Sequence, residues 1–230
     1  HPDYEAGWGF MSVTEGLWNH FLQDDTYRRD VAIISEDMLA QDLADAGVSC
    51  SPIIDATQNN PIDFTGYWQR KYANYKSFAG TNVNGGNEHL TKAQNTHVLR
   101  YADVLLMLAE ALHRGNGSDG EAMNHIDQVR ERAAGPGDNS STFRTSATVM
   151  AEENWSLQEL IWYERRAELA CEGDRWFDLV RSGRAESSLF AGDGDKADNF
   201  EEKHLWLPIA LEETVLATSL TTYPDASLFN

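Results

Sequence analysis

The chain is poor in basic residues. It carries 18 Lys and Arg against 37 Asp and Glu, which gives a formal net charge of −19 over 230 residues. Binding to nucleic acid requires a basic face that replaces the counterions of the phosphates, so this balance argues against nucleic acid as a partner. It also argues against electrostatic binding to anionic lipid. The surplus of acid favours solubility and indicates little about a substrate.

Cysteines and long apolar runs are also scarce. Cys50 and Cys171 are far apart and form no framework of short spacings, so the sequence does not favour a disulfide between them. Cys171 lies among apolar residues and is interpreted as a small core residue. No run of about 18 apolar residues indicates a transmembrane helix, and no signal-peptide pattern is present. The chain begins at His1 without Met, which we interpret as the start of a fragment of a longer protein.

Catalytic and metal-binding motifs are missing as well. The sequence has no GxSxG, GxGxxG, Walker or HExxH motif, and its 7 His are scattered, so we expect no cofactor. Residues 193–198 faintly resemble a calcium loop, with aspartates at 193, 195 and 198. That segment lacks the oxygen ligand at the fifth position, the glycine at the sixth and the terminal Glu, so it does not predict a calcium site.

What the chain does contain is helical periodicity in its second half. Residues 98–112 predict a helix, with Thr96 as its N-cap and Gly115 at its end. One apolar stripe runs along it, and a second apolar face indicates a helix packed between two neighbours. The first stripe consists of Val98, Tyr101, Ala102, Leu105, Leu108, Ala109 and Leu112, and the second of Val104, Leu106 and Ala111.

A second helix follows after a short turn. Ser118–Glu121 has the pattern of a capping box, the apolar face continues through Ala122, Ile126, Val129 and Ala133, and Gly135-Pro136 predicts the end. Two helices so joined form a hairpin of the kind found in tetratricopeptide arrays, although no clean repeat follows. Residues 135–154 predict a polar loop. Ser156–Glu159 is a second capping box, which begins a long helix interrupted near Gly173-Asp174 and ended by Gly183.

The first third predicts mixed structure. Residues 14–21 and 29–45 predict short helices, and residues 61–78, a polar run with several aromatic residues, predict a loop, a hairpin or both. Near the other end, residues 205–209 predict a short apolar strand. These short elements would add to a mainly helical fold.

Residues 164–181 combine five acids and four arginines with core-type side chains. Glu164, Glu168 and Glu172 recur at every fourth position, so they share a helix face and repel one another unless cations neutralise them. The available cations are Arg165 and Arg175 nearby and Arg100, Arg130 and Arg132 on the preceding hairpin. One interpretation is a catalytic acid–base pair chosen from Glu164, Glu168 and Asp178. We favour a structural ion-pair network, because neighbouring arginines lower the pKa of every carboxyl alike.

Aromatic residues in predicted loops are the other candidates for a site. Tyr4, Trp8 and Phe10 lie in a Gly-containing stretch, and Trp68 and Tyr75 lie in the second aromatic region. Flat rings in loops stack on the apolar faces of sugars. They also pack loops onto a core, and the sequence leaves both interpretations open.

Four motifs in order make the chain resemble the SusD/RagB family of nutrient-binding outer-membrane lipoproteins. They are Val98–Leu112, similar to the family's RYADVLLMxAEA helix; His125–Ala133, similar to INxVRxRA; Glu164–Arg181, similar to ERRxELAFEGxRWFDLxR; and His204–Ile209, similar to HxxxPIP. Asp25–Asp30 and Thr65–Tyr72 resemble weaker family elements, DPRR and TGYxxRKY. Tyr27 and Ala210 stand where the family usually has Pro, and residues 218–224 lack its QNPGY tail. The resemblance extends from about Gly7 to Leu216 and covers the C-terminal half of such a protein.

The resemblance implies a fold and a role. The fold would be mainly α, with tetratricopeptide-like hairpins, long loops and a few short strands, in one domain over residues 1–230. The protein would be a cell-surface glycan binder rather than an enzyme. It would deliver its ligand to a SusC-like TonB-dependent outer-membrane transporter and touch the membrane only through an N-terminal lipid anchor absent from this chain.

Ligand residues follow from the same resemblance. Loop aromatics would bind the glycan, with Tyr4, Trp8 and Phe10 as first candidates and Trp68 and Tyr75 as weaker ones. An anionic glycan would require a local basic patch, for which Arg28, Arg29, Arg70 and Lys71 are available. Two alternatives remain, a helical-repeat adaptor that binds a protein and an α-helical glycosidase.

Overall fold

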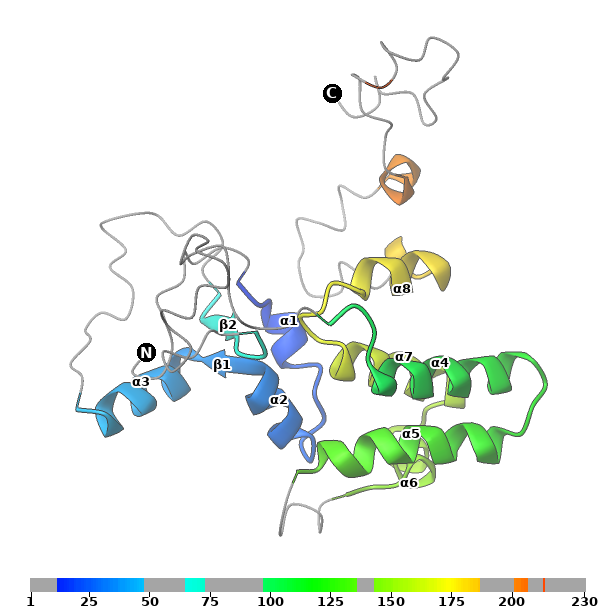
Figure 1. Cartoon of the computed structure of the whole chain (residues 1–230), viewed down its shortest axis with the longest axis horizontal. Helices are drawn as coiled ribbons and strands as arrows, with labels where there is room; N and C mark the ends of the chain where they lie inside the picture. Colours follow the sequence, from blue (N-terminus) through cyan, green and yellow to red (C-terminus); the bar gives the residue numbers. More distant parts are fainter. Residues whose placement is uncertain are drawn as a thin grey trace, which may run out of the picture. The chain divides into compact units, whose positions relative to one another are not determined.

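The computed structural model describes residues 12–47, 65–72, 97–135, 143–186, 201–206 and residue 213. Within these ranges the chain is mainly helical with a few short strands, as predicted (Figure 1). It divides into two compact units, residues 1–172 and 173–230. The predicted single domain over residues 1–230 stays a prediction. The first unit contains α1 Glu15–Trp18, α2 Thr26–Ala32, β1 Ile33–Ser35, α3 Glu36–Asp45, β2 Tyr67–Gln69, α4 Tyr101–Arg114, α5 Asp119–Ala133, α6 Ser146–Glu153 and α7 Leu157–Glu168.

Helices α4 and α5 form the predicted hairpin and lie side by side (Figure 1). Ser118 caps α5 by accepting a hydrogen bond from the Glu121 N–H, and Gly135, at φ +85°, follows its end. The predicted N-cap of α4 at Thr96 is wrong, because the extended residue before the first turn is Arg100. At the other end Gly115 follows the last turn, but the left-handed residue of the connection is Asn116.

The buried face of α4 differs from the predicted stripe. Leu105, Leu106 and Ala109 are buried, whereas Tyr101 and Leu108 are exposed. The reason is that α5 and α7 both pack on the side of α4 that carries Leu106, a residue the sequence assigned to the second face. Helix α4 therefore has two helical neighbours, as predicted, but Val104 and Ala111 of its second apolar face are exposed.

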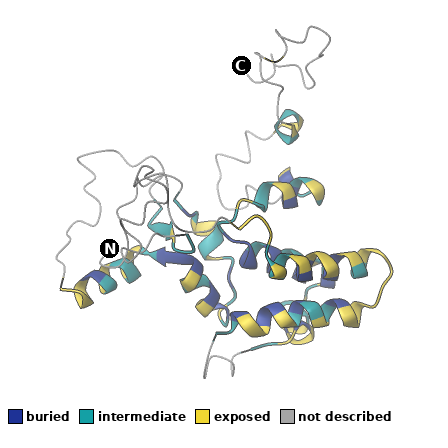
Figure 2. Cartoon of the chain, in the orientation of Figure 1, coloured by how far each residue is buried: buried dark blue, intermediate teal, exposed yellow. Residues whose placement is uncertain are grey.

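The core of the first unit lies where α4, α5, α6 and α7 meet (Figure 2). Its fully buried side chains include Leu106, Ile126, Val149, Leu160 and Ile161. The predicted apolar face of α5 is confirmed, since all four of its residues are buried. Burying a Leu or Ile side chain contributes about 1.5–3 kcal/mol, so this cluster is the main source of stability in the unit.

Helix α6 was not predicted, and its region was expected to be a loop. Thr145 caps α6 through its side chain, and Asn154, in the left-handed conformation, ends it. The N–H of Ser146 donates a hydrogen bond of 2.6 Å to the Asp127 carboxylate on α5, which joins the start of α6 to the hairpin. A threonine followed by helix-forming residues is a recognisable start signal, but the many Ser, Thr and Gly residues before it obscured the signal.

A short sheet interrupts the predicted helix over residues 29–45. Strand β1 separates α2 from α3 and pairs antiparallel with β2, with Ile33 opposite Gln69 and Ser35 opposite Tyr67. Ile33 and Ile34 are β-branched and buried, which favours a strand at this point. Helix α1 begins as predicted, with Thr14 accepting a hydrogen bond from the Leu17 N–H.

Helix α7 starts with a complete capping box. Ser156 accepts from the Glu159 N–H and Glu159 accepts from the Ser156 N–H, as the sequence predicts. The helix ends earlier than expected, because Leu169 is its C-cap and Cys171 takes a left-handed φ of +65°. The predicted break near Gly173 is confirmed, with φ of +95° at that glycine.

The described part of the second unit contains α8 Arg175–Arg181 and a 3-10 helix Glu202–Leu205. Gly183 follows α8 at φ +68°, in agreement with the predicted end. The strand predicted from residue 205 is wrong at its first residue, which closes the 3-10 turn, and residues 207–209 lie outside the described residues. None of the helices described here is long and apolar enough to cross a membrane.

Candidate functional site

Three glutamates line one side of α7 and the residues after it. Glu164 and Glu168 lie on the helix, and Glu172 follows its last turn. Glu164 is fully buried, and only 2% of Glu168 is exposed to solvent. Buried carboxylates are stable as ions only when cations and hydrogen bonds replace the lost water, so the partners of these groups decide what the site is.

Glu164 is enclosed by two arginines. Its Oε2 accepts a hydrogen bond of 2.9 Å from Arg28 of α2, and its Oε1 accepts one from Arg130 of α5. Arg28 also binds Asp25, which accepts a further hydrogen bond of 2.7 Å from the Tyr163 hydroxyl. Glu164 therefore joins α2 to α5 through α7.

Glu168 has three arginine partners. Arg100, the residue before α4, donates to its Oε1 at 2.8 Å, Arg132 of α5 donates to the same atom, and Arg28 lies 3.6 Å from its Oε2. Burial alone would raise the pKa of Glu168, but the charges of Arg132 and Arg28 and the hydrogen bonds outweigh it and lower the pKa. Glu168 is thus held as a carboxylate.

Glu172 completes the series. Arg100 donates two hydrogen bonds of 2.7 Å to its carboxylate, and Lys71 forms an ion pair with it. Lys71 also donates to the Glu168 carbonyl oxygen at 2.7 Å, near the end of α7. Burial lowers the pKa of Lys71, against the opposing effect of Glu172. Lys71 follows β2, so this contact ties the sheet to α7.

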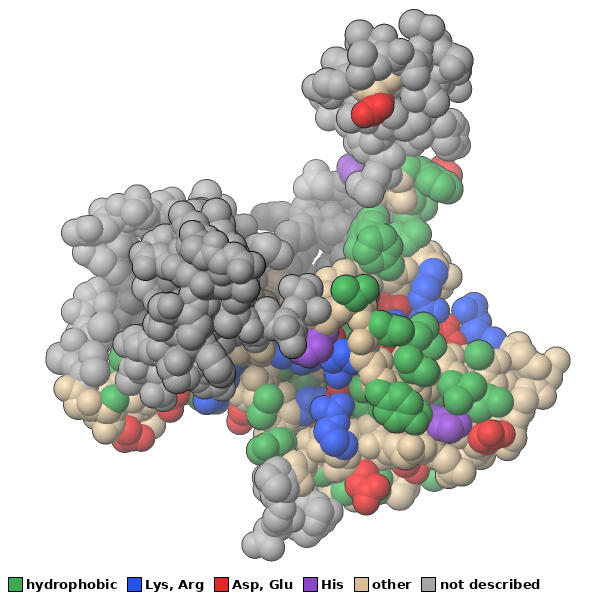
Figure 3. Space-filling model, viewed as in Figure 1, with side chains coloured by type: hydrophobic (Ala, Val, Ile, Leu, Met, Phe, Trp, Pro, Cys, Tyr) green, Lys and Arg blue, Asp and Glu red, His purple; other side chains and the backbone are tan. Residues whose placement is uncertain are grey.

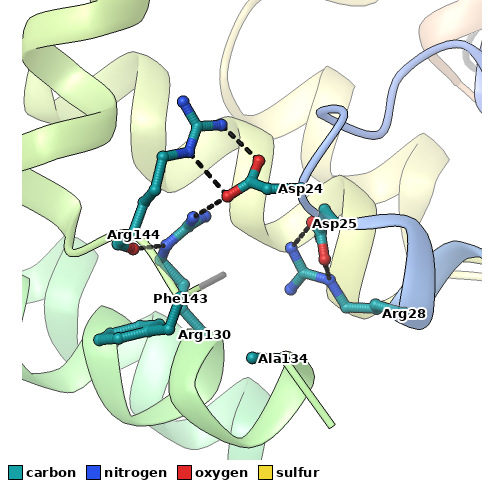
Figure 4. Close-up of a pocket in the computed structure, with 7 residues that line it drawn as sticks. All are labelled: Asp24, Asp25, Arg28, Arg130, Ala134, Phe143 and Arg144. Carbon is teal, nitrogen blue, oxygen red and sulfur yellow. Dashed lines mark hydrogen bonds and ion pairs between the residues drawn. The ribbon is translucent and has the colours of Figure 1, made fainter. Parts of the chain in front are cut away.

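A small pocket borders this network (Figure 4). Arg144 donates a hydrogen bond of 2.7 Å to Asp24, and Arg130 donates one of 3.0 Å to the Arg144 carbonyl oxygen. The cavity measures about 10 Å³, which is room for about one water molecule and far too little for a sugar ring. It is lined by Asp24, Asp25, Arg28, Arg130, Ala134, Phe143 and Arg144.

The pKa values of the two aspartates that line the pocket shift in opposite directions. Burial raises the pKa of Asp25 in spite of the Arg28 charge. Burial acts the same way on Asp24, but the hydrogen bond and charge of Arg144 outweigh it and lower the pKa of Asp24. The difference follows from exposure, because the more buried carboxyl loses more hydration.

The geometry favours the structural interpretation of the cluster. The predicted cations Arg100, Arg130 and Arg132 are confirmed as partners, whereas Arg165 binds Asp103 at 2.8 Å instead of Glu168. Sequence reasoning missed Arg28 and Lys71, since nothing local links them to α7. A catalytic acid and base need different surroundings, so that one carboxyl is protonated and the other ionised. Glu164 and Glu168 are both enclosed by guanidinium groups, so their surroundings do not differ in this way. Asp178 lies in the second unit, where it pairs with Arg181 as predicted.

The predicted basic patch for an anionic glycan is not formed by its four members together. Arg28 and Lys71 are used in the network, and Arg29 pairs with Asp30 at 2.8 Å. Arg70 donates to the Asp30 carbonyl oxygen at 3.2 Å. Each of these cations therefore already has a carboxylate or a backbone carbonyl oxygen as a partner.

Of the predicted ligand residues, the structure describes one. Trp68 lies in β2, paired with Ile34, and is half-buried. Tyr4, Trp8, Phe10 and Tyr75 lie outside the described residues. Their roles stay predictions.

An aromatic stack next to Trp68 was missed. Trp18 of α1 stacks on Tyr67 of β2 with ring centroids 4.8 Å apart, and the Arg29 guanidinium lies 3.9 Å from the Trp18 ring centroid. Tyr67 belongs to the aromatic region of the sequence, but Trp18 gave no signal, because the pairing is made by tertiary contact. The stack attaches α1 to the sheet.

The described residues hold no cluster of three or more His, Cys, Asp or Glu side chains that could bind a metal ion. The 193–198 segment lies outside them. Cys171 is a half-buried free thiol whose pKa is raised by burial, and Cys50 is not among the described residues.

Comparison with known proteins shows the family to which the chain belongs. The model of the SusD family matches residues 36–205, which is most of the chain. The chain therefore belongs to the SusD family, as its motifs predicted.

Its relatives are longer proteins. It is 32% identical to SusD-like protein P2 of Formosa agariphila, over 64% of this chain and 28% of that protein. It is 33% identical to SusD-like protein P38 of the same organism, over 53% of this chain and 26% of that protein. The chain thus spans about a quarter of the length of these relatives.

The fold is shared with a crystal structure of a SusD superfamily protein from Bacteroides vulgatus. The TM-score is 0.61 and the identity 23%, over 96% of this chain and 46% of the other. This likeness confirms the predicted mainly helical, SusD-like fold.

Proposed function

We propose that this chain is part of a cell-surface glycan-binding protein that takes part in nutrient uptake. The observation that carries the proposal is the SusD family match over residues 36–205. In such a role the chain binds an oligosaccharide and passes it to a SusC-like TonB-dependent transporter in the outer membrane. The polypeptide would be held at the membrane by an N-terminal lipid anchor.

The buried ion-pair network supports a binding role more than a catalytic one. It is packed between helices, and the cavity beside it admits about one water molecule. A glycan needs an open surface on which aromatic rings stack against sugar faces. We therefore place the ligand site on Tyr4, Trp8, Phe10, Trp68 and Tyr75.

The test is affinity electrophoresis of the natural polypeptide in gels that contain polysaccharides chosen from a glycan array. Trp8→Ala and Trp68→Ala should lose most of the retardation, because each removes a stacking surface worth about 1 kcal/mol or more. Trp206→Ala is the matched control, since Trp206 is half-exposed and outside the proposed site. Retardation that is unchanged in both site variants would overturn the site assignment.

The same preparation separates the alternatives. Release of reducing ends from a polysaccharide would identify a glycosidase. Capture of a protein partner without any glycan binding would favour the helical-repeat adaptor, which the α4–α5 hairpin supports. Co-purification with a SusC-like transporter tests the delivery step.

A further inference from the structure

The turn between α4 and α5 contains the dipeptide Asn116-Gly117, and both residues are exposed. Figure 3 shows this end of the hairpin at the right, where backbone and uncharged polar atoms form the surface. In an Asn-Gly pair the backbone nitrogen of the glycine can attack the side-chain amide carbon of the asparagine, because glycine has no Cβ to obstruct the approach. The pair is therefore chemically labile, and the reaction is a deamidation.

The geometry of the turn requires a pair of this kind. Asn116 follows the last turn of α4 at φ +58°, in the left-handed region that Gly and Asn adopt most readily. The backbone of Gly117 lies against the end of the helix, since a Cβ at this position would be 2.9 Å from both the carbonyl oxygen and the Cδ2 of Leu112. A left-handed residue is thus followed by a position without room for a side chain, and Asn-Gly meets both conditions.

The same geometry restrains the nitrogen that would react. The Gly117 N–H donates a hydrogen bond of 2.7 Å to the Leu112 carbonyl oxygen, which is the bond that closes a Schellman-type helix end. The nitrogen must lose this proton and move towards the Asn116 side chain before it can attack. Both changes require the hydrogen bond to break, so the closed turn opposes the reaction.

Two side-chain contacts hold the turn closed from its two ends. His113, in the last turn of α4, lies with its Nδ1 2.8 Å from the Asp119 carboxylate at the start of α5. Ser118 caps α5 by accepting a hydrogen bond of 3.2 Å from the Glu121 N–H. Release of the Gly117 nitrogen therefore depends on local opening of the hairpin end.

We propose that Asn116 is a site of spontaneous deamidation that the closed α4–α5 turn protects and that reacts when the turn opens. A base removes the proton from the Gly117 nitrogen, a bond forms between this nitrogen and the Asn116 Cγ, and the side-chain nitrogen leaves as ammonia. Water then opens the cyclic imide at either carbonyl, which gives aspartate or isoaspartate. This proposal rests on the turn and not on glycan binding.

Both products weaken the end of the hairpin. Each introduces a carboxylate at the C-terminal end of α4, where the helix dipole is negative. Isoaspartate also lengthens the backbone at residue 116, which shifts the Gly117 N–H away from the Leu112 carbonyl oxygen. Because hydrolysis is irreversible, a molecule whose turn has opened and reacted keeps the weaker turn.

The test measures deamidation of each asparagine by peptide mapping with mass spectrometry, in folded protein and in protein unfolded in urea at the same mildly alkaline pH. Folding should slow the reaction of Asn116 at least about tenfold, because only opened molecules react. In urea Asn116 should react as fast as Asn84, which also precedes a glycine. Asn154 is the control for backbone conformation, since it is left-handed at φ +56° but precedes Trp155. It should react far more slowly than Asn116 in urea.

Two matched substitutions separate opening of this turn from unfolding of the whole protein. Ser118→Ala removes the cap of α5, and Thr145→Ala removes the corresponding cap of α6. Loss of a cap costs a helix about 1 kcal/mol, so Ser118→Ala should speed the reaction of Asn116 in folded protein about fivefold and leave the rate in urea unchanged. Thr145→Ala should speed it less.

A rate for Asn116 in folded protein that lies within about tenfold of the rate in urea would overturn the proposal. Equal rates in the two cap variants would also overturn it, because local opening of the α4–α5 turn would then not control the reaction.

Discussion

At the scale of single residues, Glu164 is a buried carboxylate held by two arginines. It is fully buried and lies between Arg28 and Arg130. Two buried guanidinium groups therefore share this carboxylate, although Arg28 also pairs with Asp25 and Arg130 lies 3.9 Å from Asp24. Removing one partner of a buried ion pair leaves charge without compensation, and this cost exceeds the net value of the pair itself.

Glu164→Gln should lower the free energy of unfolding by about 3 kcal/mol, because the amide cannot neutralise either arginine. Urea denaturation followed by circular dichroism measures the change. Glu131→Gln is the control, since Glu131 is exposed on α5 and its replacement should change stability by less than about 0.5 kcal/mol. Equal effects of the two substitutions would contradict the role given to Glu164.

Glu168 makes stability depend on pH. Its pKa is lowered in the folded chain, so its contribution is complete above the ordinary glutamate pKa of 4.5 and is lost as the pH falls through the folded value. Asp25 acts in the opposite direction, because its raised pKa means that its contribution is lost as the pH rises.

We expect the Tm to fall on acidification below about pH 4.5, and the Tm difference between wild type and Glu168→Gln to shrink over the same range. Thermal melts between about pH 7 and about pH 3 measure both quantities. A Tm difference between the two proteins that is constant over this pH range would show that the Glu168 charge does not contribute to stability.

At the scale of secondary-structure elements, the sequence predicted the serine caps of α5 and α7 but not the start of α4 at Arg100. The Ser156 and Ser118 caps are confirmed, because capping depends on residues only three apart. Helix α6 and strand β1 were missed. Both depend on contacts between residues far apart in the sequence. Ser146 of α6 binds Asp127 of α5. Strand β1 pairs with β2, and the paired residues Ile34 and Trp68 are 34 positions apart (68 − 34 = 34).

Substitutions of Asn154 test why α6 ends at this residue. It ends the helix with a φ of +56°, a conformation that costs a residue with an ordinary side chain about 1–2 kcal/mol. Asn154→Ala should therefore destabilise the protein by about 1 kcal/mol, whereas Asn154→Gly should be close to neutral. Chemical denaturation of both variants provides the comparison, and equal losses would contradict the conformational explanation.

At the scale of the whole molecule, the acidic surplus acts against the compact state. The net charge is −19, and repulsion between exposed like charges is screened by salt. The ion pairs of the network are mostly buried, so salt weakens them much less than it weakens contacts at the surface.

Raising NaCl from about 0.02 M to about 0.3 M should therefore raise the Tm, because it shortens the Debye length from about 20 Å to below 10 Å. Differential scanning calorimetry measures the shift. Choline chloride at equal ionic strength is the control for a specific effect of sodium. A Tm that falls with salt would show that exposed ion pairs outweigh the general repulsion.

The sequence by itself determined the family, the helical hairpin, the helix caps and the pairing of α7 glutamates with hairpin arginines. These features depend on short spacings and on apolar periodicity, which are legible along the chain. Only the tertiary structure decided that Arg28 and Lys71 join the network, that Trp18 stacks on Tyr67, and that Tyr101 and Leu108 of α4 are exposed. Those features require residues far apart in sequence to meet, and a linear pattern does not record which side of a helix its neighbours cover.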